Sequence, residues 1–448
     1  MKKLNVLYVH SHDTGRFISP YGYKVDTPRL QQFAEEGILF RRAFNVAPSC
    51  SASRSGLLTG MAPHNNGMLG LAHMGWKLND YKQHLIHTLH AQGYVSALSG
   101  IQHIAAKPAA KTEDIGYTEI LPVTSKKAED ITDRALEYLD RDHDNPFFLA
   151  VGYFDTHRPF PVRDERDDPR YTAVAPPLDD NAENREDMAA FNTTARVWDT
   201  SVGRILDKLE ERGLADNTLV IVTTDHGLPM PHMKCKLTDH GLGVLLMMRG
   251  PDGIAGGKVV DGMVSHIDIF PTICEILQIN TPEWVQGRSV LPLIHGEAEE
   301  VNEEVFAEIT YHAAYEPKRA VRTKRYKYIR RFDDNYSKEV LPNCDDSVCK
   351  AQLVKENWGN SEPAEEQLYD LLFDPQEKTN LADSSKHADV LEDMRGRLQA
   401  WMERTDDPLL KGPVPLSEHG KTWKQSAVML REEPMYNVQG EPIVKEPY

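Results

Sequence analysis

The sequence has few cysteines, a deficit of basic residues and no long apolar stretch. Five irregularly spaced cysteines among 448 residues do not form the paired pattern of a disulfide framework or a zinc site. Lys and Arg number 51 against 68 Asp and Glu, a formal net charge of −17, which disfavours binding of nucleic acid or heparin-like polymers through a broad basic face. No apolar run approaches the roughly 18 residues of a membrane-spanning helix, so we expect neither nucleic acid nor membrane as a partner.

The N-terminal residues and two closely spaced cysteines bear on the cellular compartment. The apolar run Leu4–Val9 ends at the polar His10, which makes it too short for the core of a signal peptide. We therefore expect a cytoplasmic protein, or one whose leader has been removed. Cys344 and Cys349 are close enough to close a small loop, but we expect both to be reduced in a solvent-facing loop.

Strand-like and helix-like segments alternate through the first 300 or so residues. Aliphatic and β-branched runs predict strands, and apolar residues at helical spacing predict helices. The strands are expected at Leu4–Val9, Gly93–Leu98, Phe147–Phe154 and Thr218–Thr223, and the helices at Pro28–Gly37, Ala128–Leu139 and Thr194–Arg212. This alternation predicts an α/β fold with a large, mainly parallel sheet sandwiched by helices. Polar clusters directly follow the predicted strands, where sites gather in such folds.

The pattern changes after about residue 300. Short segments there predict antiparallel strands at Glu304–Thr310, Ala320–Thr323 and Arg325–Ile329. A further strand is expected at Glu366–Leu372, followed by a turn at Asp374-Pro375 and a helix start at Thr379-Asn380-Leu381. Residues 407–448 are proline-rich and predict an irregular tail over the surface. We therefore expect an α/β domain over 1–300, a smaller α+β subdomain over 301–406 and a tail over 407–448. A homo-oligomer with the tail near a partner subunit stays open.

The segment Cys50-Ser51-Ala52-Ser53-Arg54-Ser55-Gly56-Leu57-Leu58-Thr59-Gly60 is the most informative in the chain. It resembles, position for position, the Cys-x-Pro/Ala-Ser-Arg and Leu-Thr-Gly signature of the type I sulfatases of the alkaline phosphatase superfamily. The resemblance implies that a maturation enzyme oxidises Cys50 to formylglycine. In the family, one hydroxyl of the hydrated aldehyde attacks sulfur and the other expels sulfate. The resemblance also places Arg54 one helical turn after Cys50, where its guanidinium can hold the diol and an acidic ligand.

Two further strings resemble the metal-binding motifs of the family. Asp225-His226-Gly227 follows one predicted strand, and Asp13 follows the first strand. A hard divalent ion takes several oxygen ligands from separate loops. The resemblance therefore implies that Asp13, Asp225, His226 and the converted Cys50 bind a metal ion. We expect Ca2+, with Mn2+ or Mg2+ as alternatives, because imidazole also suits manganese or zinc.

The first metal-binding string departs from the family pattern. Most sulfatases have two adjacent aspartates after the first strand, whereas this chain has His12 and Asp13 there, or Asp13 and Thr14 if the register shifts by one. Asp13 is retained in both alignments. Whether His12 or Thr14 ligates the metal stays open.

Three basic residues resemble groups that handle sulfate in the family. Lys234, in Lys234-Cys235-Lys236-Leu237-Thr238-Asp239-His240-Gly241, matches a lysine that grips a sulfate oxygen, although Thr238 replaces the usual Tyr and Lys236 competes for the role. His157 matches the His-x-Pro-Phe turn, which implies that it assists the leaving alcohol. His103 matches the histidine of Gly-Lys-x-His, which promotes release of sulfate. That motif's lysine is replaced by Ile101, and Gln102 offers only a neutral donor.

Other strings bear on specificity and on the fold. His64-Asn65-Asn66-Gly67-Met68 and Leu71-Ala72-His73 resemble the branch that contains heparan N-sulfatase, and His312 is expected in the substrate pocket. Tyr326-Lys327-Tyr328-Ile329 and Leu368-Tyr369-Asp370-Leu371 match strings of the family's C-terminal subdomain. The resemblance therefore implies a sulfatase-like fold and hydrolysis of sulfate esters or sulfamates of sugars, with N- or O-sulfate undecided.

Two other functions stay open at this stage. Phosphonate monoester and phosphodiester hydrolases of the same superfamily share the formylglycine signature and an Asp-His metal pair. This chain lacks both the lysine of the Gly-Lys-x-His motif and the second aspartate after the first strand, and these two absences favour such a hydrolase. A binding protein without turnover would keep Cys50 as a thiol and bind no metal.

Overall fold

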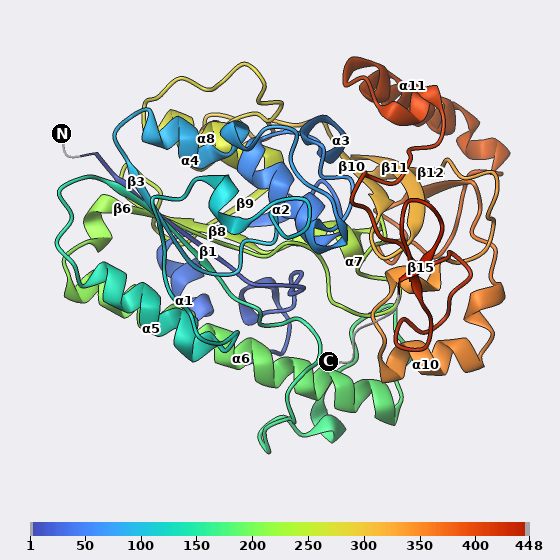
Figure 1. Ribbon diagram of the computed structural model, residues 1–448, viewed down its shortest axis with the longest axis horizontal. Coiled ribbons are helices and arrows are strands. Elements are labelled where there is room, and N and C mark those ends of the chain that lie inside the picture. Colours follow the sequence, from blue (N-terminus) through green and yellow to red (C-terminus); the bar gives the residue numbers. More distant parts are fainter. Residues whose placement is uncertain (1–2, 444–448) are drawn as a thin grey trace.

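The computed structural model describes residues 3–443 and contains a large sheet between two layers of helices, with a smaller sheet at one end (Figure 1). The strand order of the large sheet is β4-β3-β5-β1-β6-β8-β2-β7, and β9 pairs with β2. These strands are β1 (Asn5–His10), β2 (Ile38–Phe44), β3 (Val95–Gly100), β4 (Glu119–Ile120), β5 (Phe147–Gly152), β6 (Thr218–Thr223), β7 (Gly243–Val244), β8 (Leu246–Arg249) and β9 (Lys258–Ser265). β3, β5, β1 and β6 are parallel, whereas β8 is antiparallel to both β6 and β2. The expected mainly parallel α/β sheet is confirmed.

Helices cover both faces of this sheet. One layer contains α1 (Pro28–Glu36), α5 (Ala128–Leu139) and α6 (Ala182–Glu211), and the other contains α2 (Cys50–Thr59), α4 (Leu85–His90) and α8 (Ile269–Ile276) (Figure 1). Successive residues of β1 enter different cores: Leu7 and Val9 pack with the first layer, and Val6 and Tyr8 with the second. A strand buried on both faces explains why its sequence is continuously apolar rather than alternating.

The smaller sheet is antiparallel, with the order β10 (Glu304–Tyr311), β11 (Tyr315–Thr323), β12 (Tyr326–Arg331) and β13 (Glu366–Asp370). Helix α11 (Ala388–Arg404) contacts β11 and β12, and α10 (Val348–Lys355) lies on the side of α6 (Figure 1). The expected antiparallel C-terminal sheet is confirmed. The helix expected from Thr379 is wrong, because turns follow β13 and α11 begins at Ala388. The domain limits at 300 and 406 stay predictions.

The described part of the tail, 407–443, is mostly irregular. It contains a short 3-10 turn at Pro408–Lys411 and a two-stranded ribbon of β14 (Met435–Tyr436) and β15 (Pro442–Ile443). Its backbone bonds to loops of both sheets, since Lys421 N donates to Met74 O and Trp423 N donates to Ala313 O, each at 2.9 Å. Residues 444–448, the end of the predicted tail, lie outside the described residues.

Two local features differ from the expectation. Helix α6 begins at Ala182 rather than Thr194, because the Asn181 side chain accepts a hydrogen bond from Asn184 N and caps the helix. Cys344 and Cys349 are free as expected, but they are buried rather than solvent-facing. Within residues 3–443 no helix has both the length and the apolar composition to cross a bilayer.

Candidate active site

The carboxylates Asp13 and Asp225 meet at the carboxyl ends of β1 and β6. These strands are parallel neighbours, with His10 opposite Thr223, so the loops that follow them emerge side by side. Asp13 has a positive φ of 52°, a conformation that a short polar side chain tolerates. Its backbone N donates to Asp225 Oδ1 at 2.8 Å. The pairing of the two strands therefore fixes the relative position of the two carboxylates.

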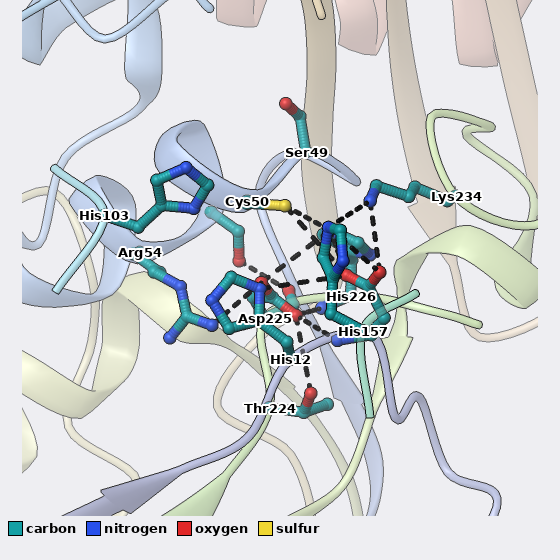
Figure 2. Close-up of polar contacts among 12 residues, drawn as sticks. His12, Ser49, Cys50, Arg54, His103, His157, Thr224, Asp225, His226 and Lys234 are labelled. Atoms are coloured by element: carbon teal, nitrogen blue, oxygen red, sulfur yellow. Dashed lines mark hydrogen bonds and ion pairs between the residues drawn. The ribbon is translucent and has the colours of Figure 1, made fainter. Parts of the chain in front are cut away.

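Cys50 begins α2 and faces these carboxylates (Figure 2). Its Sγ lies 3.3 Å from His226 Nε2 and 4.0 Å from Asp13 Oδ1. One ligand atom from each of Asp13, Cys50, Asp225 and His226 can be chosen so that all four lie within 4.8 Å of one another, and all four residues are buried. The fold therefore brings together the four residues that the sequence analysis predicts as metal ligands.

The donor set fits a divalent cation. Two buried carboxylates and an imidazole converge on one point, and oxygen with some nitrogen is the chemistry of Ca2+, Mg2+ and Mn2+ sites. Nε2 of the buried His12 lacks a hydrogen-bond partner within the described part of the chain, whereas its Nδ1 lies 3.3 Å from Asp225 Oδ2. Such an unpartnered buried nitrogen is costly unless a ligand occupies it.

His12, not Thr14, turns toward this point. His12 forms a second group of possible ligands with Asp13, Cys50 and His157. The Thr14 hydroxyl instead bonds Ser11 Oγ at 2.6 Å and Thr156 Oγ1 at 3.0 Å. The geometry therefore favours the register in which His12 occupies the position of the family's second aspartate.

Arg54 bonds the carboxylate of Asp225. Its Nη2 donates to Asp225 Oδ2 and to Ser11 O, both at 2.9 Å, and its Nη1 contacts His10 Nδ1. Burial opposes ionisation of Asp225, but the charges of His226 and Arg54 outweigh it and hold the pKa of Asp225 well below its usual value. Asp225 is therefore ionised in the folded protein.

Lys234 reaches the site, whereas Lys236 does not. Lys234 Nζ donates to Asp13 Oδ2 at 3.1 Å and lies 3.5 Å from His157 Nε2 (Figure 2). Burial lowers the pKa of Lys234, but the charges of Asp13 and Asp345 raise it well above its usual value. Lys236 pairs with Glu316 and Glu339 instead. The geometry therefore resolves the competition between the two lysines.

Asp345 is a site residue that the sequence analysis missed. Its Oδ2 accepts from Lys234 Nζ at 2.9 Å, and it comes from the segment before α10, far along the chain. The charge of Lys234 lowers the pKa of Asp345 against the effect of burial. No motif surrounds Asp345, so only the tertiary fold reveals its role.

The remaining predicted residues line the same site. His157 Nε2 lies 3.9 Å from Asp13 Oδ2. The ring of His103 stacks on that of His73 with centroids 5.4 Å apart, and His103 Nε2 lies 3.2 Å from His73 Nδ1. His312 Nδ1 bonds Ser49 Oγ at 2.9 Å, next to Cys50. Burial lowers the pKa values of His12, His103 and His312 well below the usual value, so these three imidazoles are neutral at pH 7.

The loop that carries His103 is held by side chains without a motif role. Ser51 Oγ donates to His103 O at 2.6 Å and accepts from Ala72 N at 3.0 Å, which joins both histidine loops to α2. The Gln102 amide accepts from Ala105 N at 2.9 Å and donates to Ala105 O at 2.6 Å. Gln102 therefore stabilises its own loop and does not replace the missing lysine.

The comparisons with known proteins agree with this geometry. A family model described as sulfatase matches residues 4–279, and one described as N-sulphoglucosamine sulphohydrolase, C-terminal, matches residues 232–357. The chain belongs to the sulfatase family. This sulfatase is 28% identical to the N-sulphoglucosamine sulphohydrolase of Homo sapiens over 464 residues, which cover 91% of this chain and 92% of that protein.

Other relatives support the same family and fold. The sulfatase is 31% identical to an ulvan-active sulfatase of Formosa agariphila over 416 residues, or 87% of this chain and 78% of the relative. The crystal structure of a putative sulfatase from Bacteroides fragilis superimposes with a TM-score of 0.74 at 21% identity, covering 92% of this chain and 98% of that one. The chain is therefore a sulfuric ester hydrolase by family, with the expected sulfatase architecture.

Proposed function

We propose that this sulfatase hydrolyses sulfate esters or sulfamates of sugars, using a formylglycine made from Cys50 and one divalent cation. The observation that carries the proposal is that Cys50 Sγ lies beside Asp13, Asp225 and His226, while Lys234 bonds Asp13. The N-sulphoglucosamine sulphohydrolase and the ulvan-active sulfatase are both named for a saccharide substrate, which supports a sugar substrate for this enzyme.

Asp13, Asp225, His226 and His12 would hold the cation. When bound, a divalent cation polarises the sulfate group and lowers the pKa of a coordinated hydroxyl. Formylglycine supplies the paired hydroxyls that a cysteine lacks, and its formation requires a maturation enzyme as partner. Arg54 keeps Asp225 ionised and oriented for this purpose.

Lys234 and His157 act on the sulfate and its leaving group. The ammonium of Lys234 donates to a sulfate oxygen and stabilises negative charge as it develops in the transition state. His157 Nδ1 donates a hydrogen bond to Arg158 O at 2.5 Å, so Nε2 is the atom that faces Lys234 and the substrate. In its protonated form His157 donates from Nε2 to the bridging oxygen as the S–O bond breaks.

His103 removes a proton in the second half of the reaction. Its Nε2 is paired with His73 Nδ1, whereas its buried Nδ1 has no partner in residues 3–443. Nδ1 is therefore the atom that accepts the proton from residue 50 when sulfate is released.

The test is coexpression with a formylglycine-generating enzyme, followed by peptide mass spectrometry on the segment around Cys50. We expect converted protein to release sulfate from an aryl sulfate and from sulfated glucosamines, and Cys50→Ala to release none. A preference of many fold for an aryl phosphodiester would instead support the phosphodiesterase alternative, which the histidine in place of the second aspartate favours. Absence of turnover by fully converted, metal-loaded protein would contradict both hydrolase functions.

A further inference from the structure

A large cavity opens beside the sulfate-handling residues. It has a volume of about 880 Å3, and its lining includes His157 and Asp345, both of which contact Lys234. One wall comes from the loop 157–163 and from the start of α6, and the other from residues 345–348 and 430–431. A cavity of this size accommodates a ligand much larger than a sulfate ion. It therefore lies where the group that leaves the sulfate extends from the site.

The walls of the cavity are largely apolar. Pro159, Phe160, Pro161 and Leu430 line it, together with Val162 and Val348. Val162 is 94% exposed and Val348 is 53% exposed, although clustered exposed apolar side chains are unfavourable unless a ligand covers them. Apolar and aromatic walls are suited to the C–H faces of a sugar ring.

The charged groups of the cavity are mostly acidic. The cavity is lined by five carboxylates and three arginines, which are Glu183, Glu186, Asp187, Asp345 and Asp346, and Arg158, Arg163 and Arg431. Arg158 Nη1 donates to Asp187 Oδ1 at 2.9 Å and Arg163 Nε donates to Glu186 Oε1 at 2.7 Å, so two of the arginine charges are compensated within the wall. Asp346 likewise accepts from Lys350 Nζ at 2.9 Å, so these charges are largely compensated within the wall, and the specificity depends on the direct contact of a ligand with Asp345.

Asp345 joins the cavity to the sulfate-binding lysine. One carboxylate oxygen accepts from Lys234 Nζ, and the side chain is 19% exposed and lines the cavity. An ionised carboxylate only accepts hydrogen bonds, so it pairs with a hydroxyl or an amide N–H and repels a carboxylate. The group beside the sulfated position must therefore carry a donor.

We propose that this cavity binds an uncharged sugar residue attached to the sulfated sugar, a hexose or an N-acylated hexosamine, with Asp345 as hydrogen-bond acceptor. The enzyme thereby selects sulfated chains in which the neighbouring residue is neutral over those in which it is a uronic acid. This specificity rests on the proposed sulfatase function.

The test uses two disaccharides that carry the same sulfated hexosamine and differ only in the neighbour, a hexose or the corresponding uronic acid. We expect the converted wild-type enzyme to have at least a tenfold higher kcat/KM for the neutral disaccharide. Asp345→Asn should raise KM for the neutral disaccharide by a larger factor than it lowers kcat. It should also reduce the ratio of kcat/KM for the neutral disaccharide to kcat/KM for the uronate. Val348→Lys, which adds a cation at an exposed position of the wall, should narrow the preference by improving kcat/KM for the uronate.

Matched variants outside the cavity provide the controls. Asp334→Asn removes an exposed carboxylate of the same subdomain, and Val197→Lys adds a cation at an exposed position of α6. Both should keep the wild-type preference. A wild-type preference of one or below, or equal preferences in Val348→Lys and Val197→Lys, would overturn the proposal.

Aryl sulfate separates this specificity from the function on which it rests. Turnover of aryl sulfate with no preference between the disaccharides would overturn the specificity alone. No sulfate release from any of the three substrates would overturn the specificity and the sulfatase function together.

Discussion

Two lysines only two positions apart have different surroundings. Lys234 faces Asp13 and Asp345 in the site, and Lys236 pairs with Glu316 and Glu339 away from it. Sequence spacing could not separate them, because both precede the same Asp-x-Gly string. Their roles differ by the side chains that the fold places around each ammonium.

We expect Lys234→Ala to lower kcat/KM for aryl sulfate by roughly 100- to 1,000-fold, the effect of removing one preorganised donor to transition-state charge. Lys236→Met should keep kcat within several fold but should lower the thermal midpoint, because it removes the ammonium that pairs with the buried Glu316 and Glu339. Steady-state kinetics and thermal unfolding of both variants measure the two effects. Equal losses of kcat in the two variants would contradict the assignment of Lys234.

The proposed metal site predicts a response to chelation. Dialysis against a chelator should abolish turnover of aryl sulfate and lower the thermal midpoint, because a cation that binds only the folded state stabilises it. Readdition of Ca2+, Mg2+ or Mn2+ in separate samples identifies the ion by recovered activity and by elemental analysis. Full activity in protein shown to be free of divalent metal would refute the metal site.

At the scale of elements, the sheet positions the site. Parallel pairing of β1 with β6 brings Asp13 to Asp225, and the start of α2 brings Cys50 to both. Apolar runs and the helical pattern locate these elements, and the family strings locate the residues at their ends. Most of the large sheet and much of the site could therefore be predicted.

Other parts could not be predicted, for physical reasons. Asp345 reaches Lys234 only through packing between distant segments, and no local pattern encodes that contact. The start of α6 could not be predicted, because its first half does not continue the apolar stripe of the second half. Met188 and Phe191 of the first half belong to a separate small hydrophobic cluster. Cys344 lies in a polar segment but is covered by Leu341 and Trp358, so composition alone suggested exposure.

The cap of α6 offers a test at this scale. The Asn181 side chain accepts from Asn184 N at 2.8 Å, and loss of such a cap typically costs about 1 kcal/mol. We expect Asn181→Ala to lower the free energy of unfolding by about that amount, measured by urea denaturation. Asn181→Asp keeps the acceptor and should lose much less; equal losses would argue against capping as the cause.

At the scale of the whole molecule, both sheets share one interior. A single hydrophobic cluster includes Val6 and Phe148 of the large sheet and Val321 and Leu368 of the small one. A buried ion network reinforces it: Glu308 accepts from His64 Nδ1 at 2.9 Å, and Arg319 pairs with Glu308 and Asp407. The network joins the large domain, the small sheet and the tail.

This network predicts an acid-dependent loss of stability. Burial opposes ionisation of Glu308, but His64 and Arg319 outweigh it and lower its pKa to about 2 from 4.5. Because the folded-state pKa is the lower one, the stabilisation is complete above pH 4.5 and is lost as the pH falls toward 2. Glu308→Gln should cost about 3–5 kcal/mol at pH 7 and less at pH 3, measured by urea unfolding.

The exposed Glu362, in the same part of the chain, provides the control for this experiment. Glu362→Gln should leave both the free energy of unfolding and its pH dependence near those of the wild type. A Glu308→Gln variant whose loss of stability is the same at both pH values would show that the network does not act through ionised Glu308.

The depth at which Cys50 lies constrains when it can be modified. Its side chain is 1% exposed, beneath loops from both sheets, so an enzyme that works on the thiol cannot reach it once the chain has closed. At least about 400 residues are translated after this cysteine, which takes roughly 20–80 s or longer at ribosomal speeds of 5–20 residues per second. The proposed conversion of Cys50 therefore has to precede closure of the chain, and the proposal predicts that the yield of working enzyme depends on how fast the host synthesises it.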